Sequence, residues 1–129
     1  MVEHASARIL VVDDDTASRM TLDVVLFCAG YDVATAANAE EALGWFMQRE
    51  FDLVLIEPTL PGMSAFELAR HARTCQPGAR VIFYAAGDAT DVLDAVGDVD
   101  YLRALTGPDE VVYLMGAAPA AQPGLRLAA

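Results

Sequence analysis

Short apolar runs alternate with segments of helical periodicity along most of this chain. The runs are rich in valine, isoleucine and leucine, and they show little of the polar alternation that marks a strand with one solvated face. This pattern predicts buried parallel strands. The expected strands are Arg8–Val12, Tyr31–Thr35, Leu53–Ile56 and Val81–Tyr84, with Val99–Leu102 as a weaker fifth.

The segments between these runs carry helix signals. Asn38 and Ser64 each precede a glutamate by three residues, which is the capping-box pattern of a helix start. Gly30 and the run Gln76–Gly78 are typical of helix ends. The expected helices are Ala17–Cys28, Ala39–Phe46, Ala65–Cys75, Asp88–Val96 and Asp109–Met115.

The alternation of strand and helix predicts the architecture. It favours an α/β domain whose parallel sheet is covered on both faces, with right-handed crossovers. With 129 residues and 55% hydrophobic content, one domain can bury a core of its own. We assign residues 1–115 to this domain, and residues 116–129, rich in alanine and proline, to a flexible tail.

The charge of the chain narrows the range of partners. The formal net charge is −11, and nucleic acids and anionic membranes are bound mainly through lysine and arginine, so neither is an expected partner. A neutral or basic protein fits better. No apolar run approaches the roughly 18 residues of a membrane span. Because Met1–His4 has no signal-peptide character either, we expect a cytoplasmic protein.

Two residue types limit the chemistry. All eight basic residues are arginine, so any mechanism that needs a lysine ammonium group is excluded. Cys28 and Cys75 show no metal-ligand spacing with each other or with the two histidines. We expect both cysteines to be buried structural residues and assign them no chemistry.

Acidic residues follow two of the expected strands. Asp13, Asp14 and Asp15 come after the first strand, and Glu57 ends the third. In parallel sheets, sites lie outside the carboxyl ends of the strands, where these side chains would converge. Clustered carboxylates either raise their pKa values or bind a cation, and oxygen ligands suit Mg²⁺. The alternative is that the aspartate run is a solvated loop that caps the following helix.

Taken together, these features resemble the receiver domain of bacterial two-component response regulators. The resemblance rests on Ile9–Asp15, Leu53–Glu57 and the loop Leu60–Met63, which occur at the family's intervals, and it covers about residues 7 to 115. It implies a flavodoxin-like, doubly wound, five-stranded parallel sheet of order 2-1-3-4-5. In that family, an aspartate at the end of the third strand accepts a phosphoryl group, the paired acids hold Mg²⁺, and a hydroxyl and a lysine read the charge.

The resemblance also indicates a degenerate phosphoacceptor site. Asp13 and Asp14 match the paired acids, but Glu57 stands at the acceptor position. Ala85 replaces the hydroxyl residue, and Ala104 replaces the lysine. Pro58, which follows the acceptor position, has no N–H to offer a phosphoryl oxygen. The sequence therefore predicts a receiver that is not phosphorylated here.

The same resemblance assigns a metal set and a partner face. Any Mg²⁺ would be held by Asp14, Glu57 and Thr59, although no cofactor is required. A solvated acidic surface is the alternative for the aspartates of the partner face. The residues assigned to that face are Asp91, Asp94, Tyr101 and Arg103.

We therefore expect a stand-alone pseudo-receiver: a non-enzymatic module of two-component or phosphorelay signalling that acts through protein–protein interaction. Its partner would be a signalling protein, a histidine kinase or a phosphotransferase, and a homodimer is also open. Permanent mimicry of phosphorylation by Glu57 is disfavoured, because a carboxylate carries one negative charge against roughly −1.5 to −2 for phosphate. Two alternatives remain. One is a receiver still phosphorylated on a carboxylate of the acidic site, and the other is a metal-assisted hydrolase that uses Asp13 or Asp14 as nucleophile or base.

Overall fold

The computed structural model describes residues 7–84, 111–114 and 125–128 of the chain. Three helices and six strands lie in these ranges. The strands are β1 (Arg8–Val12), β2 (Asp32–Ala36), β3 (Leu53–Ile56), β4 (Arg80–Tyr84), β5 (Val111–Leu114) and β6 (Leu125–Ala128). The helices are α1 (Thr16–Cys28), α2 (Ala39–Phe46) and α3 (Ala65–Cys75).

The helix starts are set by local side-chain caps. Asn38 accepts a hydrogen bond from the Glu41 N–H, and Ser64 forms a full capping box with Glu67. Asp15 caps α1 by accepting from the Ser18 N–H. Each cap satisfies a backbone donor that the first turn of a helix leaves without a partner. The two starts expected at Asn38 and Ser64 are therefore confirmed.

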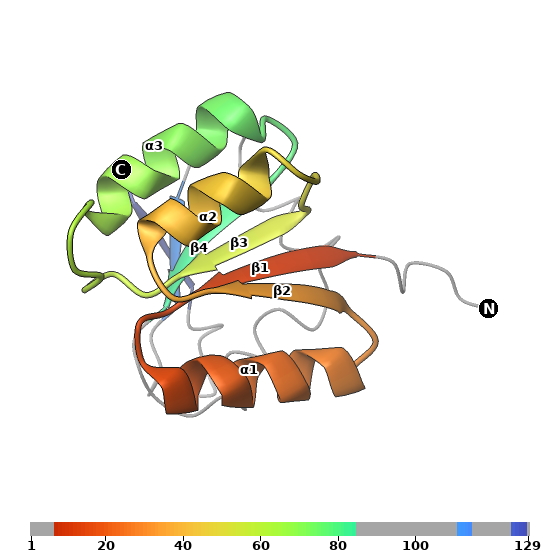
Figure 1. The fold of residues 1–129 in the computed structure, drawn as a ribbon. Coiled ribbons are helices and arrows are strands. Elements are labelled where there is room, and N and C mark those ends of the chain that lie inside the picture. Colours follow the sequence, from red (N-terminus) through yellow and green to blue (C-terminus); the bar gives the residue numbers. More distant parts are fainter. Residues whose placement is uncertain (1–6, 85–110, 115–124, 129) are drawn as a thin grey trace.

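The sheet has the strand order β2-β1-β3-β4-β5-β6. Pairs from β2 through β5 are parallel, and β6 runs antiparallel to β5. Helices α2 and α3 cover one face of the sheet, and α1 covers the other (Figure 1). This confirms the α/β flavodoxin-like fold and the order 2-1-3-4 for its first four strands.

The two faces of the sheet bury separate apolar clusters. Leu10 and Val12 pack with the α2 and α3 side, while Ile9 and Val11 pack with Leu22 of α1 and its neighbours. Successive strand residues point to opposite faces, so a strand covered on both sides must be apolar at every position. This explains why β1 and β3 read as continuous apolar runs.

The end of the chain differs from the sequence expectation. Residues 111–114, expected inside a helix over Asp109–Met115, form strand β5 beside β4. Residues 125–128, expected in the flexible tail 116–129, form strand β6. In the described residues the sheet has six strands, and the antiparallel β6 was not among the five parallel strands expected. The expected helix Asp88–Val96 and strand Val99–Leu102 lie outside the described residues.

The conformation of residues 111–114 depends on a partner that is distant in the chain. Val111 and Val112 are β-branched and suit a strand, but the helix-start signal of Pro108 outweighed them in the sequence interpretation. The open edge of β4 supplies a hydrogen-bonding partner that no local pattern reveals. Pairing along that edge decides the conformation of the segment.

Helix α1 presents an apolar surface to solvent. Met20, Val24 and Phe27 are 61%, 59% and 69% exposed, while Leu22 and Leu26 are buried against the sheet. The periodicity that predicted this helix followed Met20 and Val24, so the helix is confirmed while the apolar stripe lies on its outer side. Among the described residues, no helix has the length and apolar content needed to cross a membrane.

Both cysteines are free and exposed, which corrects the expectation that they are buried. Cys28 is the last residue of α1, and Cys75 is the last residue of α3. Apolar character favoured burial, but a position at a helix end leaves each side chain at the surface.

Candidate functional site

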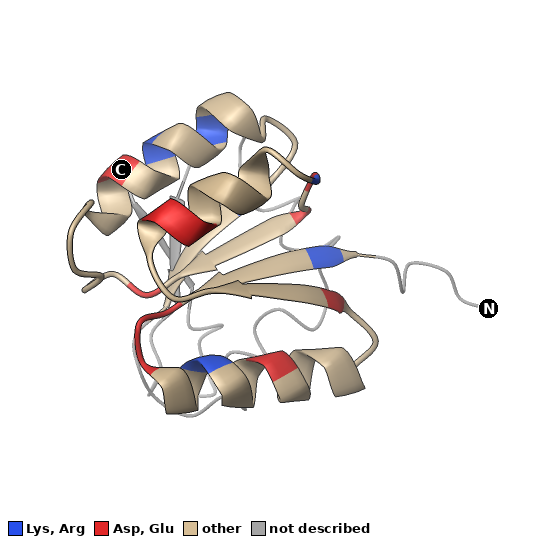
Figure 2. Ribbon diagram, viewed as in Figure 1, with Lys and Arg blue, Asp and Glu red and all other residues tan. Residues whose placement is uncertain are grey.

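Acidic side chains converge at the carboxyl edge of the sheet. Asp13 follows β1, Glu57 follows β3, and these two strands are neighbours in the sheet. Figure 2 shows the acidic segments after β1 and β3 side by side at the same end of the sheet. One carboxylate oxygen from each of Asp13, Asp14 and Glu57 lies within 4.8 Å of the others. The convergence expected from the sequence is confirmed.

Asp13 is fixed through both its backbone and its side chain. Only 1% of its surface is exposed. Its N–H donates to the Ala36 carbonyl at 3.0 Å, and Arg19 Nη1 donates to its carbonyl at 2.7 Å. Its Oδ1 accepts from the Asp15 N–H at 2.9 Å, and its Oδ2 accepts from the Tyr84 hydroxyl at 2.5 Å. Both carboxylate oxygens therefore have donors within the protein.

The side chain of Glu57 is fixed by hydrogen bonds from the loop that follows it. Its N–H donates to the Val12 carbonyl at 2.9 Å, which continues the β1–β3 pairing. The residue is 8% exposed, and its Oε1 accepts from both the N–H of Thr59, at 3.0 Å, and the hydroxyl of Thr59, at 2.6 Å. Pro58 stands between these residues and has no N–H. Two donors of this loop therefore bind the same oxygen of Glu57.

Tyr84 is the site residue that the sequence analysis missed. It is the last residue of β4, 2% exposed, and it packs on the α1 side of the sheet. Burial first, and then the hydrogen bond to Asp13 and the nearby carboxylates, raise the pKa of Tyr84 far above its usual range. Tyr84 therefore stays protonated and donates. The available signal was a phenol at the end of a strand that adjoins the acids.

The carboxylate set fits a hard divalent cation. Mg²⁺ prefers oxygen ligands and is commonly bound through one or two carboxylates plus water, and Asp14 is exposed enough to leave water access. Asp13, Asp14 and Glu57 are the residues that would hold the ion, which would supply positive charge against the clustered acids. Thr59, expected as a ligand, instead donates to Glu57 through its N–H and hydroxyl. A ligand role for Thr59 stays a prediction.

Several expected site residues fall outside the described residues. The structure therefore leaves their contacts as predictions, although their identities are facts of the sequence. They are Ala85 and Ala104 of the phosphoacceptor site, and Asp91, Asp94, Tyr101 and Arg103 of the partner face.

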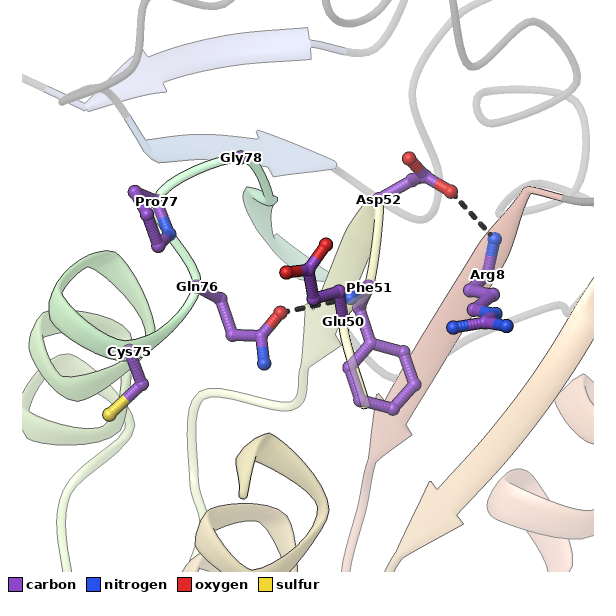
Figure 3. A pocket seen from close by; sticks show the side chains of 8 residues that line it. All are labelled: Arg8, Glu50, Phe51, Asp52, Cys75, Gln76, Pro77 and Gly78. Atoms are coloured by element: carbon purple, nitrogen blue, oxygen red, sulfur yellow. Dashed lines mark hydrogen bonds between the residues drawn. The ribbon is translucent and has the colours of Figure 1, made fainter. Parts of the chain in front are cut away.

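A pocket of about 400 Å³ opens at the opposite end of the sheet, near Arg8, Asp52 and Gln76 (Figure 3). Several polar groups of its lining already form hydrogen bonds within the protein. Gln76 accepts from the Phe51 N–H at 2.9 Å and donates to the Phe46 and Arg49 carbonyls at 3.1 and 2.8 Å. The Arg8 N–H donates to Asp52 at 2.9 Å. These contacts join loops and indicate a structural role.

Comparison with known proteins gives consistent matches. The sequence model of the family described as "Response regulator receiver domain" matches residues 9–111. The alginate biosynthesis transcriptional regulatory protein AlgB of Pseudomonas aeruginosa is 35% identical over 107 residues, which are 81% of this chain and 24% of AlgB. The matched region spans from 16% to 48% of the length of the curated relatives.

Solved structures agree with these relatives. The response regulator protein TrrA of Thermotoga maritima, in complex with Mg²⁺-BeF, is 40% identical with a TM-score of 0.58, covering 62% of this chain and 70% of that one. A structure of histidine kinase ThkA in complex with TrrA contains a chain that is 29% identical, with a TM-score of 0.63 and coverage of 90% of both chains.

Proposed function

This chain belongs to the response regulator receiver domain family of two-component signalling, and on that premise we propose that it is a non-enzymatic pseudo-receiver, which acts through protein contacts without being phosphorylated. The observation that carries the proposal is the end of β3. There, a glutamate whose Oε1 is engaged by Thr59 is followed by a proline. No charge change at this site would then drive a switch, so packing or a partner sets the conformation.

Geometry disfavours transfer to Glu57. Glutamate has one more methylene than aspartate, which displaces its oxygens by about 1.5 Å. A misplacement of about 1 Å can cost some 100-fold in rate. The Thr59 donors also point at the carboxylate itself, and the nearest following residue, Pro58, has no donor for a phosphoryl oxygen. Each of these features lowers the rate of phosphoryl transfer to Glu57.

The surroundings supply little positive charge for a phosphoryl group. Phosphoryl transfer relies on cations and donors that stabilise charge on the equatorial oxygens. The chain has no lysine, position 104 holds alanine, and position 85 has no hydroxyl. Arg19, a nearby cation of the described residues, donates to the Asp13 carbonyl. Mg²⁺ would offset part of this shortage, and its binding remains part of the proposal.

The exposed face of α1 supports a protein partner. Met20, Val24 and Phe27 lie four and three residues apart, so they share one side of the helix, and α1 begins directly after the acidic loop. Contiguous exposed apolar side chains commonly mark interaction surfaces. The ThkA–TrrA complex shows a related receiver bound to a histidine kinase. A kinase or phosphotransferase is accordingly the proposed partner class. AlgB is named as a transcriptional regulator, and the absence of a nucleic-acid partner here stays a prediction from charge.

The test is incubation with acetyl phosphate and Mg²⁺, followed by intact-mass measurement. The wild-type chain is expected to gain no phosphoryl mass, because acceptor, hydroxyl and lysine are all altered. The variant Glu57→Asp restores only the acceptor, and we expect it to stay far below one phosphoryl group per chain. A receiver with the aspartate and the lysine in place serves as the positive control. A stoichiometric adduct on Glu57 or a neighbouring acid of the wild type would overturn the proposal.

A further inference from the structure

The buried side chain of Tyr84 lies on the α1 side of the sheet, and its hydroxyl reaches the acidic cluster. Tyr84 packs in the apolar cluster beneath α1, yet its hydroxyl donates to Oδ2 of Asp13 at 2.5 Å. Both residues are almost completely buried, with 2% and 1% of their surfaces exposed. The hydrogen bond joins the ends of β4 and β1, which have β3 between them in the sheet.

This contact answers a problem that burial creates. A buried carboxylate needs either a cation or hydrogen-bond donors to offset its lost hydration. Asp13 receives one donor on each oxygen, from the Asp15 N–H and from the Tyr84 hydroxyl. A hydrogen bond to an ionised acceptor is shorter and stronger than one between neutral groups. A tyrosine hydroxyl is protonated at neutral pH, so it acts here as a donor to Oδ2.

We propose that the Tyr84 hydroxyl takes the place of a cation at Asp13: it stabilises the buried carboxylate without metal and competes with Mg²⁺ for Oδ2. The inference goes beyond the proposed function, which concerns phosphorylation and partners. It assigns Tyr84 a positioning role. Together with the Asp15 N–H, it gives each oxygen of Asp13 a hydrogen-bond donor, so this carboxylate of the candidate metal set needs no ion.

The competition follows from the charge and the lone pairs of the carboxylate. Each carboxylate oxygen offers about two acceptor sites, so the phenol leaves room for an ion but draws electron density away from it. A cation at Asp13 Oδ2 gains less attraction while the hydrogen bond from Tyr84 persists, and breaking that bond has its own free-energy cost. Removal of the hydroxyl should leave Oδ2 without this donor, and Mg²⁺ would then become its best available partner.

The test compares Mg²⁺ affinity between the wild type and Tyr84→Phe by isothermal titration calorimetry. Removal of a partner that merely orients a metal ligand typically lowers metal affinity by about 10-fold to 100-fold. Competition reverses the sign, so we expect Tyr84→Phe to bind Mg²⁺ more tightly, by about the lower of these factors. Tyr31→Phe is the matched control. Tyr31 packs on the same cluster but precedes β2 at the opposite edge, and its variant should keep the wild-type affinity. An equal or weaker affinity in Tyr84→Phe overturns the inference.

A double-mutant cycle tests whether Tyr84 acts through Asp13. In the Asp13→Asn background, adding Tyr84→Phe should leave Mg²⁺ affinity unchanged, since the competition no longer has a carboxylate to act on. A persisting 10-fold effect there would contradict the mechanism.

A measurement on the wild type covers the case in which the variant does not fold. Proton NMR should show the Tyr84 hydroxyl proton at low field, and saturating Mg²⁺ should shift it. A resonance unmoved by bound Mg²⁺, or a wild type and variant that both fail to bind the ion, would overturn the inference. A phosphoryl adduct would overturn only the proposed function, so the two failures are distinguishable.

Discussion

At the scale of single residues, the acidic edge is defined by which donor each carboxylate oxygen receives. Asp13 is held by Asp15 and Tyr84, and Glu57 is held by Thr59. Hydrogen bonds to ionised groups are worth roughly 1.5–3 kcal/mol each, so these contacts stabilise the two acids in their observed positions. These hydrogen bonds stabilise both acids without a bound ligand, which agrees with the pseudo-receiver proposed above.

Asp15 provides a pH-dependent test at this scale. Its carboxylate accepts from the Ser18 N–H at 2.8 Å, and this hydrogen bond lowers the pKa of Asp15 below the ordinary 3.8. A group whose pKa is lowered by folding stabilises the fold above its unfolded pKa and loses that contribution as pH falls through its folded pKa. Thermal unfolding should therefore show Asp15→Ala less stable than wild type near neutral pH.

The Asp15→Ala deficit should shrink once the medium is acid enough to protonate the wild-type carboxyl, which requires a pH below the ordinary pKa of 3.8. Asp15→Asn, which keeps an uncharged acceptor at the cap, should lose less at neutral pH and vary less with pH. A deficit that is constant from neutral to acid pH would contradict a role for the charged cap.

At the scale of elements, two segments behave differently from their local patterns. Helix α1 turns an apolar stripe outward, and the segment 111–114 forms a strand where a helix was expected. In both cases the neighbouring element decides the outcome. Packing against the sheet buries Leu22 and Leu26 of α1, and residues 111–114 form β5 because they pair with the edge of β4. An amphipathic pattern shows that a helix exists, but two apolar sides leave its orientation to packing.

Strand β6 gives the test at this scale. It pairs antiparallel with β5, and it lies at one edge of the described sheet, opposite β2. In an antiparallel pair, the N–H groups of alternate residues point toward the partner strand, so alternate amides within Leu125–Ala128 should exchange slowly. Hydrogen–deuterium exchange measured by NMR checks this, with a free peptide of the same sequence as the control. Peptide-like exchange at every amide would restore the flexible-tail interpretation.

At the scale of the whole molecule, acidic charge outweighs basic charge by 19 residues to 8. Such an excess destabilises the compact state through self-repulsion. The ion pairs of Arg8 and Arg49 with Asp32, at 3.6 and 3.7 Å, are solvent-exposed and contribute little. Screening should therefore relieve more repulsion than it removes attraction.

We expect the melting temperature to rise by a few degrees when NaCl increases from about 10 mM to about 300 mM, because the Debye length falls from roughly 30 Å to below 8 Å. Differential scanning calorimetry with EDTA present separates this screening from specific divalent binding. Sucrose at the same osmolarity as the NaCl serves as the non-ionic reference. A melting temperature that falls with salt would show that surface ion pairs outweigh the net repulsion.

The candidate site was predictable where it depends on strand ends. The acids that follow β1 and β3 could be placed together from sequence because parallel strands end at one edge of the sheet. Tyr84 could not, because its hydroxyl reaches Asp13 across an intervening strand, and only the register of β4 and the packing beneath α1 bring it there. The exposed position of Cys28 was likewise set by where its helix ends.

The sequence by itself determined the strand–helix alternation, the caps at Asn38 and Ser64, the acidic edge and the glutamate that follows β3, because each follows from local periodicity or residue identity. The tertiary structure decided which side of α1 is buried, which segment completes the sheet beside β4, and which donor satisfies Asp13. Those outcomes depend on contacts between residues distant in the chain, whose free energies no local pattern contains.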